Sequence, residues 1–400
     1  MDESAEVIGS IERISCWKGI SLHKLDSCTQ NMMKLANLEP DDVKSYKVGF
    51  MFNQDYAVCP AFADTANEDS KESLGLIEPM MIKTNTSAYS DADGNKQRKT
   101  YTRTRRPFCC CTTGCFGNKV NLQTREYIMT YEIGDKSKPT IVLIHGYGGS
   151  ALVFFKLYKP LIEKYHVIMI DLLGMGSSSR PHFMANDKYE AENFHLQAIE
   201  KWRQKMGLEK MTLIGHSFGG YMSAKYTINN PDRVNQLILW SPLGVEKAPR
   251  RMSEKMRRSL RQSNCIVGSM KWFTRLILNK ECNLFNFIRY WGKGCARCVV
   301  KKYVRQSFPK FTDEEFAAAY PYFYQITMQR ESGDKALYKI LRTSVLAYEP
   351  YFNDIIKLKK DGMKISFVYG DDDWLDTDMN DVKVSIQLRN AGFKVDVLEE

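Results

Sequence analysis

From about residue 120 onward, short apolar runs alternate with helix-like stretches, and this rhythm constrains the fold more than any other feature. The runs are PTIVLIHG (139–146), HVIMIDLLG (166–174), MTLIG (211–215), QLILWSP (236–242), KISFVYG (364–370) and FKVDVLEE (393–400). Before them, VNLQTREYIMTYEI (120–133) is typical of a strand pair. Strands that alternate with helices form a mostly parallel sheet covered on both faces. The pattern therefore predicts a doubly wound α/β domain over 119–400 that ends in its last strand.

One interval breaks this rhythm, because about 120 residues separate the run at 236–242 from the run at 364–370. The intervening sequence is helical in pattern and rich in Arg, Trp and Phe, and we expect residues 247–345 to form a cap. Such a cap would cover the carboxyl ends of the strands, where open α/β sheets place their ligand sites.

Residues 1–118 lack the alternation and are expected to form an N-terminal extension. Its polar tract at 84–107 contains many Ser, Thr and Asn residues and is typical of a flexible linker.

The stretch MTLIGHSFGG (211–220) contains the pattern G-x-S-x-G after an apolar run and before a helix-like segment. This context is required for a serine that a sharp strand-to-helix turn presents as a nucleophile. The pattern alone also arises by chance in long sequences, as a tight turn with a bystander serine. In this context it favours Ser217 as the nucleophile.

The turn HGYGGS (145–150) follows an earlier apolar run and is rich in glycine. A backbone N–H of Tyr147 or Gly148 can face a developing oxyanion there, and the N–H of Phe218 would be the second donor. A plain β-turn is the alternative interpretation. Asp171, which ends the next run, is expected to shape a loop rather than to act chemically.

The acidic sequence DDDWLD follows the run that ends at Gly370. The acid of a catalytic triad commonly lies at the end of a late strand, where it fixes the tautomer of a histidine. Asp373 is the first candidate for this role and Asp376 is the second.

The catalytic base is harder to find, because the triad order Ser, Asp, His places it after the last strand. None of the six histidines lies beyond residue 216. His216 adjoins the serine, His145 belongs to the glycine-rich turn, and His195 is expected to be solvated on a polar helix. Two interpretations remain: a histidine beyond Glu400, or a protein without a base. We favour the first.

Several features bear on partners and location. Residues 247–310 contain 17 Lys and Arg against two acidic residues, and Arg250, Arg251, Trp272 and Phe273 are candidates for membrane contact. A cap helix packed on the core with solvated charges explains the same pattern equally well. Cys109, Cys110, Cys111 and Cys115 follow a basic run and are candidates for S-acylation, or free thiols in a loop.

Composition excludes other classes. No apolar run is long enough to span a membrane, the N-terminus lacks a secretory pattern, and eleven irregularly spaced cysteines suggest reduced thiols in a cytosol-facing protein. No nucleic-acid motif accompanies the net charge of +10, so nucleic acid is not an expected partner. No metal site or cofactor is expected, and no feature indicates an oligomeric state.

Together, HGYGGS, FFKLYKPLIEKYHVIMIDLLGMGSSSRP, LIGHSFGGYMSAKY and FVYGDDDWLD resemble the α/β-hydrolase-domain lipid acylhydrolases and acyltransferases. The resemblance covers about residues 120–400 and extends to the cap. It implies hydrolysis or transfer of acyl chains on glycerolipids or phospholipids, including lysophosphatidic acid, by a protein peripheral on membranes or lipid droplets.

Within this family, non-catalytic members carry asparagine in place of the nucleophile, whereas this chain has Ser217. Asp373 matches the aspartate of the family's YG-x-x-D-W pattern, and Asp376 the aspartate used by members that lack the first. The family's His-x-x-x-x-Asp motif, which is tied to acyl transfer, is not found before Glu400. The alternative function is a non-catalytic protein that docks on lipid surfaces and regulates another lipase.

Overall fold

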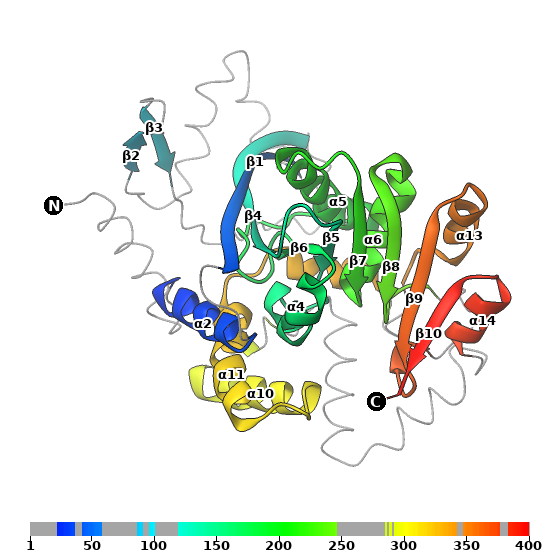
Figure 1. The fold of residues 1–400 in the computed structure, drawn as a ribbon. Helices are drawn as coiled ribbons and strands as arrows, with labels where there is room; N and C mark the ends of the chain where they lie inside the picture. Colours follow the sequence, from blue (N-terminus) through cyan, green and yellow to red (C-terminus); the bar gives the residue numbers. More distant parts are fainter. Residues whose placement is uncertain are drawn as a thin grey trace, which may run out of the picture. The chain divides into compact units, whose positions relative to one another are not determined.

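The computed structural model describes residues 22–36, 42–57, 86–90, 96–100, 119–245, 285, 288–289, 292–341, 347–376 and 383–399. It forms two compact units: residues 1–14 with 53–123, and residues 15–52 with 124–400. The larger unit contains an eight-stranded sheet with the strand order β1-β4-β6-β5-β7-β8-β9-β10 (Figure 1).

The strands of this sheet are β1 (Val43–Ala57), β4 (Lys119–Ile133), β5 (Thr140–Ile144), β6 (His166–Ile170), β7 (Met211–His216), β8 (Val234–Trp240), β9 (Lys364–Gly370) and β10 (Lys394–Leu398). The α-helices are α2 (Leu22–Lys34), α4 (Phe155–Ile162), α5 (Lys188–Lys205), α6 (Phe218–Asn229), α10 (Lys293–Ser307), α11 (Asp313–Met328), α12 (Ala336–Ile340), α13 (Phe352–Lys360) and α14 (Val384–Asn390). Short 3₁₀ turns are η4 (Ala151–Phe154), η5 (Pro231–Arg233), η6 (Gly333–Lys335) and η7 (Trp374–Asp376).

Six neighbouring strands of the sheet, in the order β6, β5, β7, β8, β9 and β10, pair in parallel, and β4 pairs antiparallel to β6. The doubly wound, mostly parallel sheet expected from the alternating runs is thereby confirmed. The strand pair expected at 120–133 is wrong, because this segment lies within a single long strand, β4.

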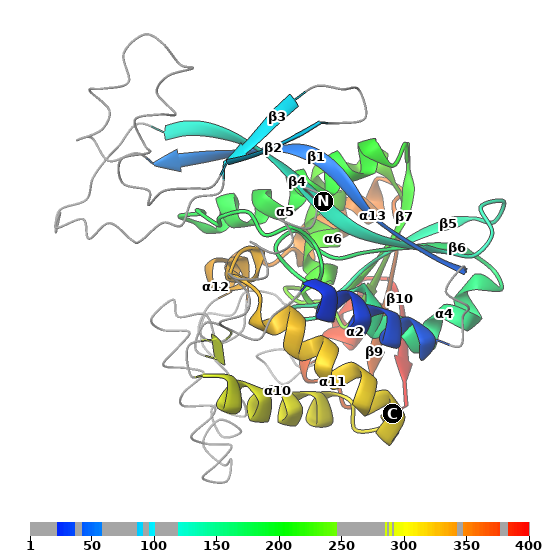
Figure 2. The ribbon, with the colours of Figure 1, turned by 90° about the vertical axis from the view of Figure 1, so that its left-hand side faces the viewer.

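Both faces of the sheet are apolar, because alternate side chains of each buried strand point to opposite sides. On β5, Val142 and Ile144 belong to one buried cluster, which α5, α6, α13 and α14 complete. Ile141 and Leu143 belong to a second cluster with α2, α4 and α11. The described residues between 285 and 341, which belong to the expected cap, are called the capping segment below. Within it, α10 packs on α11 through Ala296, Val300 and Val304 (Figure 2).

The N-terminal region differs from the expected extension, because α2 and the first part of β1 belong to the same unit as the sheet. Helix α2 buries Leu25 and Met32 against α11, and β1 buries Val48, Phe50 and Phe52 on alternate positions. The boundary expected at residue 119 therefore moves toward the N-terminus. The tract at 84–107, expected to be a flexible linker, contains the antiparallel pair β2 (Thr86–Ser90) and β3 (Lys96–Thr100) in the smaller unit.

Candidate active site at the carboxyl edge of the sheet

Ser217 occupies the turn between β7 and α6 in a backbone conformation that is unusual for a residue with a side chain. Its φ is 53° and its ψ is −117°. The N–H of Ser217 donates to the Trp240 carbonyl at 3.0 Å, and its carbonyl accepts from the Leu243 N–H at 3.2 Å. A left-handed non-glycine residue costs on the order of 1–3 kcal/mol and is typical of functional sites. The surrounding backbone therefore holds the serine in a strained turn.

Two glycines make this turn possible. A Cβ atom on Gly215 would lie 2.4 Å from the Ser223 Oγ and 2.5 Å from the Gly219 carbonyl oxygen. A Cβ atom on Gly219 would lie 2.4 Å from the His145 carbonyl oxygen and 2.5 Å from that of Ile144. Real Cβ atoms do not approach backbone so closely, so both glycines of the G-x-S-x-G pattern have a steric role.

The glycine-rich turn after β5 lies against the serine. A Cβ atom on Gly146 would lie 3.0 Å from the Ser217 Cβ, and the Gly149 N–H closes the turn on the Gly146 carbonyl at 3.2 Å. Tyr147 and Gly148 therefore belong to a turn beside the serine. Phe218 is the first residue of α6, where helix N–H groups have no acceptor within the helix. The three expected oxyanion donors thus belong to two turns that meet at Ser217.

The next loop is fixed by Asp171, which is fully buried. One carboxylate oxygen accepts from the Ala151 N–H at 2.6 Å and the other from the Ser177 N–H at 2.7 Å. Burial nevertheless raises the pKa of Asp171 to about 7. Both oxygens bind backbone, as expected for a residue that shapes a loop.

The two candidate acids after β9 differ in their partners. Asp376 is buried, and its two oxygens accept from the N–H and the hydroxyl of Ser385 at 2.6 and 2.7 Å. One oxygen of Asp373 accepts from the Leu375 N–H at 2.8 Å, whereas its Oδ2 is buried without a hydrogen-bond partner among the described residues. Asp376 therefore anchors the start of α14, and Asp373 keeps an oxygen for another donor.

Burial favours the neutral form of two histidines, His216 at the end of β7 and His145 directly after β5. Two hydrogen bonds fix the ring of His145: Nε2 accepts from the Leu172 N–H at 3.0 Å, so Nδ1 donates to the Gly146 carbonyl at 2.7 Å. Burial lowers the pKa of His145 to about 4. The ring of His216 packs edge-on against Phe154 and close to Gly146. Burial lowers the pKa of His216, and the charge of Asp373 acts in the opposite direction.

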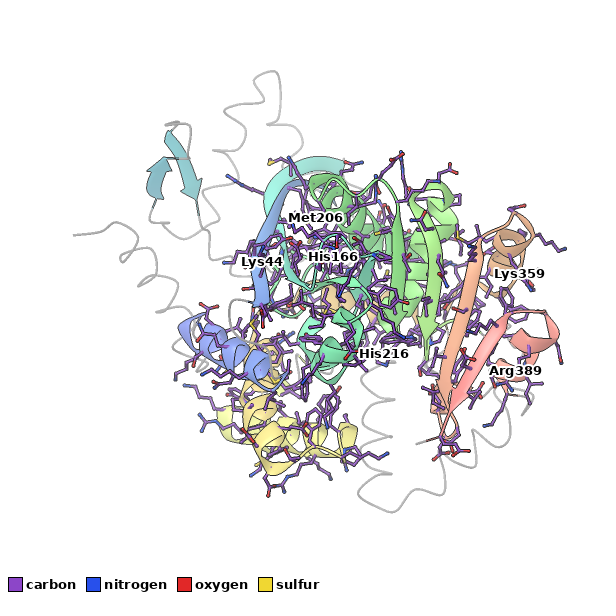
Figure 3. All side chains as sticks on the ribbon, viewed as in Figure 1. Lys44, His166, Met206, His216, Lys359 and Arg389 are labelled. Atoms are coloured by element: carbon purple, nitrogen blue, oxygen red, sulfur yellow. The ribbon has the colours of Figure 1, made fainter. Side chains whose placement is uncertain are left out.

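The other described histidines lie elsewhere. His166 contacts Glu132 and Thr140 at the start of β6, at the opposite end of the strands from His216 (Figure 3). His182 is exposed. The expectation that His195 is solvated is wrong, because its ring is completely buried between Phe218 and Gly333. Helix α5 is covered by α6 and α12, so its polar composition does not indicate exposure.

Sequence reasoning missed a charged junction between the core and the capping segment. The five N–H groups of Arg180 donate to five oxygens: the carbonyls of Gly174, Gly176, Ile326 and Arg330 and the side chain of Gln329. Nearby, Arg289 forms a buried ion pair with Asp334 at 2.8 Å. No local pattern indicates this junction, because its members come from distant parts of the chain.

Other expected site residues lie outside the described part of the chain. These are the membrane-contact candidates Arg250, Arg251, Trp272 and Phe273 and the acylation candidates Cys109, Cys110, Cys111 and Cys115. Across the described ranges, no helix is long and apolar enough to span a bilayer. In the same ranges, His, Cys, Asp and Glu residues form no cluster suited to a metal ion.

Comparison with known proteins identifies the family of this arrangement. Residues 139–397 match the family described as alpha/beta hydrolase fold. A "Probable 1-acylglycerol-3-phosphate O-acyltransferase" of Oryza sativa subsp. japonica is 29% identical over 60% of this chain and 57% of its own length. A "(Lyso)-N-acylphosphatidylethanolamine lipase" of Homo sapiens is 30% identical over 66% of this chain and 75% of its own length. The chain thus spans somewhat more than half of the plant relative.

Among solved structures, the crystal structure of a membrane phospholipase A is similar with a TM-score of 0.46. It is 20% identical, and the similarity covers 82% of both chains.

Proposed function

Because this chain belongs to the α/β hydrolase fold family, whose members include lipid acyltransferases and lipases, we propose that it hydrolyses or transfers acyl chains on glycerolipids and phospholipids through Ser217. One observation carries the proposal: Ser217 has a φ of 53° in a turn that two sterically required glycines permit. A bystander serine in an ordinary turn would not need this strain.

In the proposed reaction, the Ser217 oxygen attacks the acyl carbonyl and loses its proton to a histidine. The oxyanion accepts hydrogen bonds from the N–H of Phe218 and from the N–H of Tyr147 or Gly148. The protonated histidine then gives its proton to the leaving group, which is the glycerol oxygen of a lipid ester or the sulfur of an acyl-CoA, and an acyl-serine forms. Water attack on the acyl-serine gives hydrolysis, whereas attack by a lipid hydroxyl gives transfer.

We assign the acid of this triad to Asp373 and the base to a histidine that follows Glu400. The Oδ2 of Asp373, which is buried without a hydrogen-bond partner among the described residues, supports the first assignment, and the two hydrogen bonds of Asp376 to Ser385 oppose the alternative. The topology of the family supports the assignment of the base, since the catalytic histidine follows the last strand and β10 ends at Leu398.

The protein is proposed to act at a cytosol-facing membrane or lipid-droplet surface. Helix α10 buries Ala296, Val300 and Val304 and presents only basic charge on its exposed side. The exposed cations are Lys293, Arg297, Lys301, Lys302 and Arg305. Such a face is attracted to anionic lipid, at about 1 kcal/mol per residue near the surface.

A second candidate function is non-catalytic regulation of another lipase at the same surface. It is favoured because three described histidines are engaged elsewhere and do not serve as the base for Ser217. The buried rings of His145, His166 and His195 all bind other groups. Retention of the strained Ser217 favours the enzyme, because a regulator has no need of it.

The two functions are separated by activity with added imidazole, which can replace a missing histidine. The 400-residue chain is incubated with a lysophospholipid, with and without an acyl-CoA donor, and the fatty acid and diacyl products are quantified. We expect imidazole to raise turnover in the wild type and not in Ser217→Ala. Turnover that is equal in both proteins at every imidazole concentration would contradict the catalytic proposal.

A further inference from the structure

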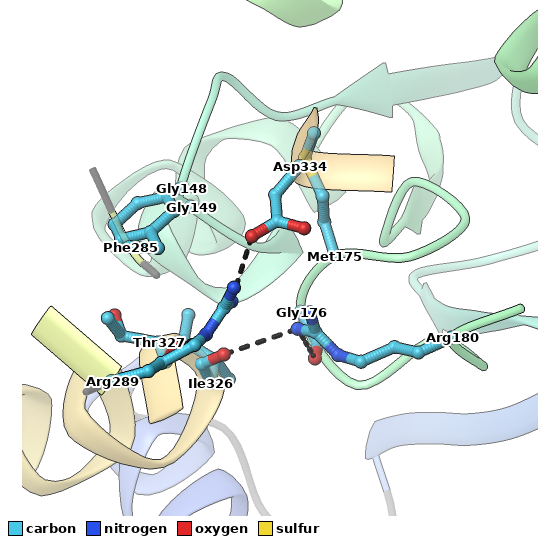
Figure 4. A pocket seen from close by; sticks show the side chains of 10 residues that line it. All are labelled: Gly148, Gly149, Met175, Gly176, Arg180, Phe285, Arg289, Ile326, Thr327 and Asp334. Carbon is cyan, nitrogen blue, oxygen red and sulfur yellow. Dashed lines mark hydrogen bonds and ion pairs between the residues drawn. The ribbon is translucent and has the colours of Figure 1, made fainter. Parts of the chain in front are cut away.

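A small cavity of about 20 Å³ lies between the turn that follows β5 and the capping segment (Figure 4). Its core side is formed by Gly148, Gly149, Met175 and Gly176. On the capping side lie Phe285, Arg289, Ile326, Thr327 and Asp334, and Arg180 completes the lining. A space of this size holds one water-sized group.

Positive charge exceeds negative charge around this cavity. Arg289 is a buried cation and Arg180 a half-buried one, and Asp334 is the one carboxylate among the described residues that line the space. Behind Gly176 lies Asp171, which does not line the cavity and whose two oxygens accept the backbone N–H groups of Ala151 and Ser177. Burial lowers the pKa of Arg180 to about 10, so its guanidinium remains charged. Excess positive charge away from water favours an anion.

The guanidinium of Arg289 is held in a fixed orientation. Its Nε donates to the Thr327 carbonyl at 2.9 Å, and its Nη2 pairs with Asp334 at 2.8 Å. The group lies 5.7 Å from the centre of the Phe285 ring, which stacks in turn on Tyr147. A planar guanidinium with a fixed fork is suited to the oxygens of a phosphate.

The cavity and Ser217 are both in contact with the turn that follows β5. Gly148 and Gly149 line the cavity, and Gly146 of the same turn lies against Ser217. In a 1-acyl glycerophospholipid, three glycerol carbons connect the ester to the phosphate. One turn of the protein can therefore contact both ends of such a lipid.

We propose that this cavity is the head-group subsite of the enzyme, where Arg289 binds the phosphate of a glycerophospholipid. The inference rests on the proposed function and adds the recognising residue to it. One phosphate oxygen occupies the water-sized space. Arg289 pairs with the phosphate in competition with Asp334, while Arg180 adds positive potential and keeps its own five acceptors.

The test is binding of a short-chain lysophosphatidic acid, measured by titration calorimetry on the 400-residue chain with Ser217→Ala as the background. This background separates the inference from the proposed function, because binding does not require catalysis. We expect Arg289→Gln to weaken binding at least 10-fold and Arg289→Lys to weaken it less. Arg233→Gln, an exposed control at the opposite end of the strands, should bind as the background does.

A second variant acts in the opposite direction. Asp334→Asn removes the competing carboxylate, so it should bind the lipid more tightly and gain more Tm on adding it than the background protein. A purely structural ion pair predicts weaker binding in both Arg289→Gln and Asp334→Asn, and that result would overturn the inference even if Arg289→Gln folds poorly.

Two further ligands identify the source of the phosphate. The monoacylglycerol of the same chain length lacks the phosphate and should bind equally to the background and to Arg289→Gln. Inorganic phosphate should bind at least 10-fold more weakly than the lysophosphatidic acid. Equal affinities for inorganic phosphate and the lipid would overturn assignment of the site to a lipid head group.

Discussion

The turn that holds Ser217 and the junction around Arg180 lie at the same edge of the sheet but are built by different forces. The turn depends on close backbone packing, with glycines where a Cβ atom would lie within 2.5 Å of a carbonyl oxygen. The junction depends on charged side chains, with five acceptors around Arg180 and a buried ion pair between Arg289 and Asp334. Steric packing thus fixes the proposed nucleophile, whereas charge connects the core to the capping segment.

The largest expected effect concerns the acids beside the serine turn. Once a histidine base is present, Asp373→Asn should lower kcat by about 10⁴-fold, because an amide stabilises the wrong tautomer. Its Tm should change little. Asp376→Asn should instead cost about 1 kcal/mol of unfolding free energy, since it weakens the bonds to Ser385. Steady-state kinetics and urea unfolding of both variants check this, and the reverse pattern would transfer the catalytic role to Asp376.

The role of close backbone packing in the Ser217 turn is tested by Gly219→Ala. The added Cβ atom meets two backbone carbonyls that cannot move independently, so we expect a loss of about 3 kcal/mol in unfolding free energy. Gly294→Ala is the matched control, because nothing lies within 4 Å of its Cβ position in α10, and it should be neutral or slightly stabilising. Equal midpoints in urea would contradict the steric account.

The role of charge in the junction around Arg180 is tested by Arg180→Lys. Lysine has three donors and no fork, so at least two of the five acceptors lose their partner, at a cost of about 2–3 kcal/mol. Arg233→Lys, at an exposed position, should change stability by less than about 0.5 kcal/mol. A junction that tolerates Arg180→Lys as well as the control would not depend on charge and geometry as described.

His195 connects the two regions, since its ring contacts Phe218 and its Nε2 lies 3.2 Å from the Gly333 carbonyl. Burial lowers its pKa to about 4. The unfolded state therefore binds a proton before the folded state does, and stability is lost as the pH falls below about 6.5. Between pH 7 and pH 5, the unfolding free energy of the wild type should fall by about 2 kcal/mol more than that of His195→Gln. A constant difference across this range would contradict the buried, neutral ring.

The same contrast explains how much could be predicted from the sequence. The strand runs and the G-x-S-x-G turn are local patterns, and the structure has strands and a strained serine there. The alternating residues of KVGFMF at 47–52 could also have indicated β1, but the long gap before β4 hid it. Arg180 and Asp334 are 154 positions apart in the numbering of the chain, so only the fold brings such charges together.

Labelling by a fluorophosphonate probe shows whether the hydroxyl of Ser217 is an activated nucleophile. The protein, with any natural sequence that follows Glu400, is incubated with the probe beside its Ser217→Ala and Ser223→Ala variants, where Ser223 is a buried serine of α6. We expect covalent labelling of the wild type and of Ser223→Ala, and loss of the label in Ser217→Ala. Labelling that is absent from all three proteins, or that persists in Ser217→Ala, would contradict this expectation.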